Sequence, residues 1–295
     1  MKYVKKGLLV FVVLSLFFPT TSYAKKVVII DPGHGGKFHG TCGHSGNKTG
    51  YCEKDANLAV ALRLKQLLMP SDITVYLTRS TDQEFGEHLK GKNGDFNQRM
   101  KIANSFAIDN NNNSIFISIH HNASPTNPFI RGIETYYYDG LNHAKPMWPH
   151  DPWQLTFLQD NKRLAEIIHP TLVDMLGLPN RKIRNNQSFY VLRNAQMPAI
   201  LVELGFMLNR NEEKLIKDED HQFIAATALA EGIITYFKVY EVFGDDNQKL
   251  ATYQSKKDAL NFAKKTKTAI RVFDKDNQTV IYDKTVSQVS GENVQ

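Results

Sequence analysis

Short apolar runs alternate with helical segments along most of the chain, and this alternation constrains the fold more than any other feature. The runs "KVVIID", "ITVYLTR", "SIFISIH", "GIETYYYD" and "PAILVE" have the length and residue types of buried strands. Between them lie segments with apolar residues at helical spacing, such as "LAVALRLKQLL". Strands that alternate with helices predict an α/β fold: a twisted, mostly parallel sheet with helices on both faces.

Two long helices are expected in the second half of this region. Apolar residues from Leu164 to Leu176 mark one face of the first helix, and Gly177 is expected to end it. The second helix is expected to bury one stripe, made of Phe223, Ala226, Ala230, Ile233, Ile234 and Phe237.

The pattern changes after about Lys238, where a smaller unit is expected. Two hairpins are predicted, with turns at residues 244–247 and 274–277, and "KKDALNFAKKT" between them is predicted to be helical. We therefore expect a compact ββαββ module over residues 239–286, followed by a flexible tail over residues 287–295. The sequence leaves its role open among binding to a surface, contact with a regulatory partner and capping of the first domain.

The first 24 residues have the features of a secretory signal. Three lysines precede an apolar run at residues 7–18, and Ser22-Tyr23-Ala24 places small residues at the cleavage site. The run is shorter than the ~20 residues that a membrane span needs. We therefore expect export, cleavage after Ala24, no transmembrane anchor afterwards, and a first domain over residues 25–238.

The charge of the chain narrows the class of partner. The formal net charge of the 295 residues is +6, and removal of the three signal lysines, with no acids lost, leaves +3. A mildly basic exported protein suits an anionic surface such as a cell wall or membrane. No arginine-rich stripe or aromatic RNA-binding signature is present, so no nucleic-acid partner is expected.

The chain has two cysteines, Cys42 and Cys52. In an exported protein the first expectation for such a pair is a disulfide bond. The alternative is a metal-binding pair of thiols, completed by His44.

Polar residues follow three of the expected strands and suggest a shared site. His34 lies in the glycine-rich turn after the first strand, and the third and fifth strands end at His120 and Glu203. Ligands of open α/β sheets bind at the carboxyl ends of the strands, where Glu53 at the start of the first helix can also reach. Two imidazoles and a carboxylate form a familiar zinc set, and a second carboxylate is then free for proton transfer.

Each of these residues also has an ordinary structural interpretation. A histidine at a strand end is often a hydrogen-bonded surface group, Glu53 suits the helix dipole, and Glu203 can belong to a buried ion pair. Strand alternation points His120 and His121 to opposite sides, so one of them can be structural. No HExxH sequence is present, which argues against a metalloprotease of that helical type.

Eight blocks of sequence, taken together, resemble a known family. They are "VVIIDPGHGG", "EKDANLAVALRLKQLL", "TRSTD", "QRMKIAN", "SIFISIHHNAS", "GIETYYY", "NQSFYVLRNAQMPAILVELGFMLNRNEEKLI" and "AATALAEGIITYF". In this order they are similar to the zinc-dependent N-acetylmuramoyl-L-alanine amidases of the branch called amidase type 3. The resemblance covers about Lys26 to Phe237.

The resemblance implies a set of site residues. It places a single Zn²⁺ ion on His34, Glu53 and His120, and it makes Glu203 the catalytic glutamate. The cysteines between His34 and Glu53 are no hallmark of the family, and a bridge there would brace the loop between two ligands. His121 stands where the family often has a small residue, so its role is open.

The implied reaction is hydrolysis of the amide between the lactyl group of N-acetylmuramic acid and L-alanine of the stem peptide. The implied enzyme is extracytoplasmic, associated with the bacterial cell wall and acts on peptidoglycan. His121, Asn122, Arg184 and Arg193 are candidate substrate contacts. The alternatives are a zinc peptidase that acts within the stem peptide, and a catalytically inactive wall-binding or regulatory protein.

Overall fold

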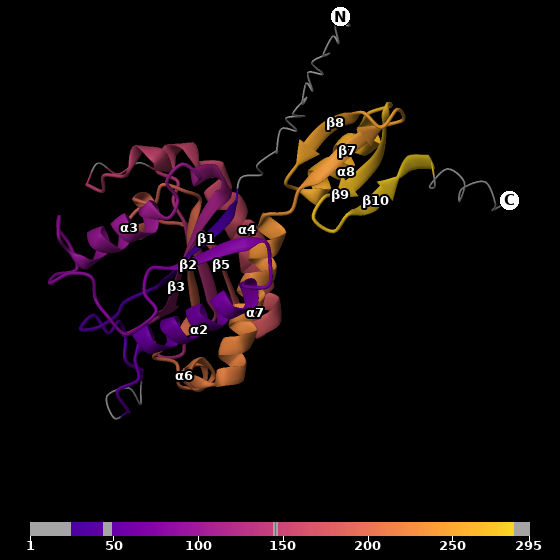
Figure 1. The fold of residues 1–295 in the computed structure, drawn as a ribbon. Coiled ribbons are helices and arrows are strands. Elements are labelled where there is room, and N and C mark those ends of the chain that lie inside the picture. Colours follow the sequence, from indigo (N-terminus) through magenta and orange to yellow (C-terminus); the bar gives the residue numbers. More distant parts are fainter. Residues whose placement is uncertain (1–24, 44–48, 144, 146, 286–295) are drawn as a thin grey trace, which may run out of the picture.

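The computed structural model describes residues 25–43, 49–143, 145 and 147–285. The expected signal (residues 1–24), His44 and the expected tail (residues 287–295) lie outside the described residues. The described chain forms a six-stranded sheet covered by helices and a separate four-stranded sheet with one helix (Figure 1). The expected α/β architecture with a small C-terminal module is therefore confirmed.

The larger sheet is mixed. Four neighbouring strands, from one edge of the sheet to its middle, run parallel. Its order is β2-β1-β3-β6-β4-β5. The first four of these strands run parallel, while β4 pairs antiparallel with β6, and β5 pairs parallel with β4. The strands are β1 (Lys26–Pro32), β2 (Ile73–Leu77), β3 (Ser114–Asn122), β4 (Ile133–Tyr137), β5 (Asn180–Asn185) and β6 (Ala199–Phe206).

Helices cover both faces of this sheet and create two apolar layers. The larger layer lies under α2 (Glu53–Leu68), α4 (Leu158–Leu176) and α7 (Glu219–Tyr236). The smaller layer lies under α3 (Asp95–Ser105) and the short α5 (Tyr190–Arg193), and Figure 1 shows α3 on the side away from α4 and α7. The remaining helix, α6 (Arg210–Lys217), follows β6. None of the described helices combines the length and apolar character that crossing a membrane requires.

Helix α4 ends as its sequence predicts, but the buried face of α7 differs from the expectation. Gly177 adopts the left-handed conformation at the end of α4. On α7, Phe223 and Ile234 are exposed, whereas Ala226, Ala230 and Ile233 are buried as expected. Because α7 packs against both α2 and α4, its buried face is broad and rich in small residues, and it extends to Ala225, Ala228, Leu229, Gly232 and Tyr236.

Strand β5 is absent from the sequence expectation, and β6 is longer than expected. β5 forms the edge of the sheet and its residues are partly or fully exposed. β6 continues three residues beyond Glu203, to Phe206. Its pairing with β3 shifts register after Glu203, and Gly205 in this irregular stretch has a φ of 142°. Such a bulge re-aims the neighbouring side chains.

The C-terminal module has the expected ββαββ order. Its antiparallel sheet has the strand order β10-β9-β7-β8, and α8 packs against β7, β8 and β9. The elements are β7 (Tyr240–Gly244), β8 (Lys249–Tyr253), α8 (Lys256–Lys265), β9 (Ala269–Asp274) and β10 (Thr279–Asp283).

The module contacts the amino-terminal edge of the larger sheet. Lys26, the first residue of β1, forms an ion pair with Asp276 at 2.7 Å, between an ammonium and a carboxylate oxygen. The same carboxylate accepts a hydrogen bond from the backbone N–H of Val239 at 2.9 Å. In Figure 1 the module lies near one end of the larger unit and α6 near the other.

A buried ionic network lies beneath the carboxyl edge of the sheet. Asp31 of β1 accepts hydrogen bonds from Thr78 (2.6 Å), Ser118 (2.8 Å) and Arg99 (2.8 Å). Arg99, which is almost fully buried, also pairs with Asp95 at 3.1 Å. Burial alone would raise the pKa of Asp31, but the charge of Arg99 and the three hydrogen bonds outweigh it, so this pKa lies below its usual value.

The variant Asp31→Asn tests how much this network stabilises the fold. Removing one partner of a buried pair is expected to lower the free energy of unfolding by about 3 kcal/mol at pH 7. The pKa of Asp31 is lowered in the folded state, so its contribution is complete above the unfolded value of about 4 and is lost as the pH falls through the folded value. The difference between wild type and variant should therefore shrink in acid, as measured by urea unfolding at pH 7 and below pH 4.

The control is Asp72→Asn, which removes an exposed carboxylate paired with Lys26. It should change stability by less than about 1 kcal/mol. Equal effects of the two variants at pH 7 would show that the Asp31 network does not stabilise the fold.

Candidate metal centre

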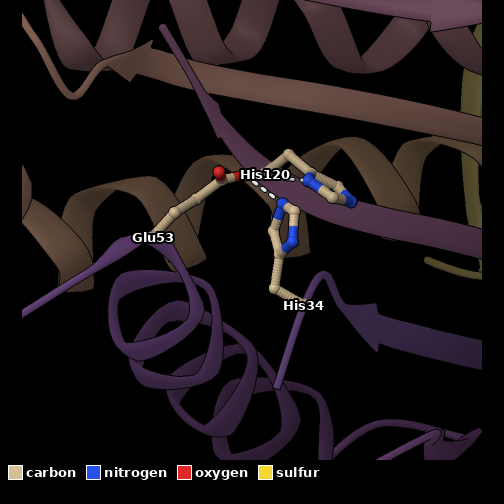
Figure 2. Close-up of side chains that lie close together, drawn as sticks. All are labelled: His34, Glu53 and His120. Carbon is tan, nitrogen blue, oxygen red and sulfur yellow. Dashed lines mark hydrogen bonds and ion pairs between the residues drawn. The ribbon is translucent and has the colours of Figure 1, made fainter. Parts of the chain in front are cut away.

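Three side chains from separate parts of the chain meet at the carboxyl edge of the parallel strands. Glu53 Oε1 lies 3.1 Å from His34 Nε2 and 2.9 Å from His120 Nδ1 (Figure 2). One candidate ligand atom from each residue falls within 4.8 Å of the others. Because β1 and β3 are adjacent and parallel, the turn after β1 and the end of β3 lie together, as the sequence predicts.

His34 is held in an unusual backbone conformation. Its φ is 62°, in the left-handed region that non-glycine residues adopt at some cost in energy. Its carbonyl accepts a hydrogen bond from the Arg99 guanidinium at 2.8 Å, which helps to keep the turn in place. The preceding Gly33 has no room for a side chain, because a Cβ there would lie 2.2 Å from the imidazole of His120.

Glu53 is the first residue of α2 and its carboxylate is buried. Its Oε2 accepts the backbone N–H of Thr41 at 3.1 Å, and its Oε1 accepts that of His121 at 3.2 Å. Burial alone would raise its pKa, but the hydrogen bonds with His120 and His34 outweigh burial, and the pKa lies well below its usual value. The carboxylate is therefore held charged between two imidazoles.

A disulfide bond lies beside this carboxylate. The structure joins Cys42 to Cys52, the residue before Glu53. The backbone N–H of Glu53 also donates to the carbonyl of Thr41 at 2.9 Å. The bridge and this hydrogen bond tie the loop after His34 to the first turn of α2, which is the bracing that the sequence suggested.

Glu203 faces the same pocket from β6. It pairs with His120 in the register of β3 and β6 and lines a cavity of about 350 Å³ together with His34, Glu53 and His120. The Glu203 side chain is buried, with 8% of the residue exposed, and Oε2 has no hydrogen-bond partner among the described residues. Burial, followed by the charges of Glu53 and Glu134, raises its pKa well above the usual value. A buried, unpaired carboxyl oxygen of this kind suits a group that transfers a proton.

The chemistry of the cluster fits a divalent metal ion. Two imidazole nitrogens and one carboxylate oxygen are donors that Zn²⁺ takes in catalytic sites, where a further position stays open. The candidate atoms of His34 and His120 already face one carboxylate oxygen, and Glu203 is among the residues that line the same cavity.

The four candidate substrate contacts lie in different surroundings. His121 is buried, its Nδ1 lies 2.8 Å from Asn57 Oδ1, and burial lowers its pKa to about 3. Asn122 lines the cavity and donates to Glu134 at 2.7 Å. Arg184 pairs with Glu134 at 3.2 Å, and Arg193 donates to the carbonyls of Ser188 and Pro149. Neither arginine is among the residues that line the cavity.

The structure adds residues that the sequence expectation did not include. Glu134 lies opposite Glu203 in the pairing of β4 with β6. Its Oε1 forms an ion pair with Arg181 Nε at 3.0 Å. The cavity is also lined by apolar and aromatic residues: Leu89, Phe96, Phe189, Tyr190, Val191 and Leu201. The blocks "QRMKIAN" and "NQSFYVLRN", which carry part of the resemblance, supply Arg99 and several of these wall residues.

Comparisons with known proteins agree with this geometry. The sequence model of a family described as N-acetylmuramoyl-L-alanine amidase matches residues 28–235. The germination-specific N-acetylmuramoyl-L-alanine amidase of Bacillus subtilis is 29% identical over 217 residues, which are 72% of this chain and 80% of that protein.

Two solved structures are similar to most of the chain. The catalytic domain of the amidase CwlV from Bacillus (Paenibacillus) polymyxa var. colistinus is 33% identical, with a TM-score of 0.56, and 72% of this chain and 97% of that chain are covered. The amidase CwlD from Clostridioides difficile, solved in complex with the GerS lipoprotein, is 31% identical, with a TM-score of 0.57 and coverage of 72% and 98%.

The variant His34→Ala tests the cluster as a metal site. Loss of one of three protein ligands should weaken Zn²⁺ binding by at least about 100-fold, which titration calorimetry measures directly. His143→Ala removes an exposed histidine outside the cluster and should bind the ion like the wild type. Stoichiometric, tight binding by His34→Ala would remove His34 from the ligand set.

Proposed function

Because the chain belongs to the N-acetylmuramoyl-L-alanine amidase family, we propose that it hydrolyses the amide between N-acetylmuramic acid and L-alanine of peptidoglycan, with one Zn²⁺ ion on His34, Glu53 and His120. The observation that carries this assignment is that these three donors and Glu203, a buried carboxyl group with one unpaired oxygen, line one cavity. Family membership gives the reaction class, and this geometry supports the assignment of roles to residues.

When bound, Zn²⁺ polarises a carbonyl group and lowers the pKa of water to about 7. The residues of the chain do the remaining work. Glu203 accepts a proton from the attacking water and delivers it to the departing alanine amine. A carboxyl group suits both steps, because it can hold the proton between them. The main-chain bonds to Glu53 keep its carboxylate directed at the two imidazoles.

The cavity offers both apolar and polar side chains to the substrate. Phe189 and Tyr190 line the cavity together with the polar residues and can exclude water from the reacting amide. Asn122 can position a polar group of the substrate beside Glu203, while Arg184 is already paired with Glu134. Arg184 and Arg193 therefore fit a role at the periphery, where they can meet stem-peptide carboxylates.

We further propose that the chain works outside the cytoplasm, at the cell wall. The secretory features of residues 1–24 and the disulfide between Cys42 and Cys52 both favour export. The C-terminal module, which the family match does not reach, is proposed to bind the wall or a protein partner. CwlD is a relative that was solved with a protein partner, which supports a search for one here.

The variant Glu203→Gln tests the proton-transfer role. Glutamine keeps the size of the side chain but cannot accept the proton, so the rate of peptidoglycan hydrolysis should fall by about 10²- to 10⁴-fold. Zn²⁺ content should stay the same, as measured by atomic emission. Glu166→Gln on the exposed part of α4 is the matched control and should keep full activity. Hydrolysis by Glu203→Gln at the wild-type rate would exclude Glu203 as the proton-transfer group.

The identity of the products distinguishes the amidase from its alternatives. Mass spectrometry of purified peptidoglycan digested by the zinc-loaded protein should show intact stem peptides that begin with a free alanine amine. Shortened stems would instead indicate a peptidase. Sedimentation of the protein with the wall, without release of any stem peptide, would indicate an inactive binding protein. A chain truncated after residue 239 would then show whether the module is needed for that sedimentation.

A further inference from the structure

The segment "TRSTD", residues 78–82, carries part of the family resemblance but has no role in the proposed chemistry. It follows β2 and lies beside the turn that carries His34. Its buried residue Arg79 is 2% exposed and directs its guanidinium into the backbone of two other segments. Asp82, in the same segment, contacts the next part of that turn.

The guanidinium of Arg79 connects the backbones next to two candidate metal ligands. Its Nη2 donates to the carbonyl of Gly33 at 3.0 Å and to that of Lys54 at 2.8 Å. These residues directly precede His34 and directly follow Glu53. Its Nε donates to the carbonyl of Pro32 at 3.0 Å, and its Nη1 donates to the carbonyl of Thr81, in its own segment, at 3.1 Å. One rigid, planar group therefore spans the turn after β1 and the first turn of α2.

A second connection runs through Asp82 and Lys54. Asp82 Oδ1 accepts the backbone N–H of Gly36 at 2.7 Å, and Oδ2 accepts from Lys54 Nζ at 2.6 Å. Lys54 Nζ also donates to the carbonyl of Gly36 at 2.9 Å. The turn around His34 is therefore fastened to α2 on both sides of the histidine.

Steric evidence shows how closely Arg79 fits this turn. A Cβ on Gly35, whose φ is 139°, would lie 3.0 Å from Arg79 Nε and 2.1 Å from the carbonyl oxygen of Gln83. Burial, with repulsion from Arg99, lowers the pKa of Arg79 to about 10, so the group stays charged at neutral pH. Lysine has no planar set of donors and cannot reproduce these bonds.

We propose that Arg79, supported by Asp82, is a positioning residue that sets the spacing between His34 and Glu53 for the metal ion. The inference rests on the proposed metal site and extends it, because Arg79 touches neither the candidate ligand side chains nor the cavity. His34 sits in a left-handed conformation that the turn alone does not favour, so an outside constraint is needed.

The test compares Arg79→Lys with Arg63→Lys, a partly exposed position on α2 that pairs with Glu219. Three quantities are measured: the unfolding midpoint of the metal-free protein, the dissociation constant for Zn²⁺ from a competition titration, and the visible absorption spectrum of the Co²⁺-loaded protein. For Arg79→Lys we expect Zn²⁺ binding about 10- to 100-fold weaker per folded molecule, and a changed Co²⁺ spectrum. Arg63→Lys should match the wild type in all three.

Two outcomes would overturn the proposal. One is wild-type affinity and spectrum in Arg79→Lys, and the other is a loss of affinity that disappears once the folded fraction is taken into account, which would mean a purely structural role. If Arg79→Lys does not fold, the same three measurements are made on Asp82→Asn. Asp82 is half exposed, and this substitution removes the charged acceptor of the bonds from the Gly36 N–H and from Lys54 Nζ. Unchanged Zn²⁺ affinity and Co²⁺ spectrum in that variant would then reject the proposal.

The variant His34→Ala separates this inference from the proposed function. If His34→Ala loses Zn²⁺ and Arg79→Lys keeps it, only the role of Arg79 is wrong. If both retain tight binding, the metal site itself is wrong.

Discussion

The pairing of Asp31 with Arg99 is the interaction on which both the fold and the site depend. A carboxylate at the end of β1, Asp31, is buried, and it stays charged because Thr78 after β2, Ser118 of β3 and Arg99 of α3 each donate a hydrogen bond to it. Arg99 then uses its remaining donors on the carbonyls of Pro32 and His34. Arg99, the ionic partner of Asp31, thus also holds the backbone of His34, a candidate metal ligand. A substitution in the buried Asp31–Arg99 pair can therefore change the position of His34 in the candidate metal site.

Much of the fold could be predicted because its central strands are apolar and its helices have regular spacing. β1, β3 and β6 are buried on both faces, so their sequences carry strong strand signals. β5 has no such signal, because "NRKIRN" lies at an exposed edge and its pairing with β4 depends on backbone bonds. The predicted buried stripe of α7 was partly wrong for a related reason. A helix packed against two others buries a wide face, and the aromatic Phe223 falls outside it.

The candidate site was predictable to the extent that its chemistry lies in side chains at strand ends. His34, His120 and Glu203 follow or end apolar runs, and the parallel order of the strands brings them together. The residues that hold this arrangement leave no comparable pattern. Arg79 binds backbone carbonyls far away in the sequence, and a carbonyl belongs to every residue. Glu134 was missed because its closeness to Glu203 arises from an antiparallel pairing that the alternation of elements did not reveal.

The attachment of the C-terminal module has a consequence for how the molecule can diversify. The module meets the larger sheet at the start of β1, through Lys26 and Asp276, while the cavity opens at the opposite ends of the strands. A partner bound to the module would therefore leave the opening of the cavity accessible. The two units can therefore be altered separately, because a substitution in the module does not change any residue that lines the cavity.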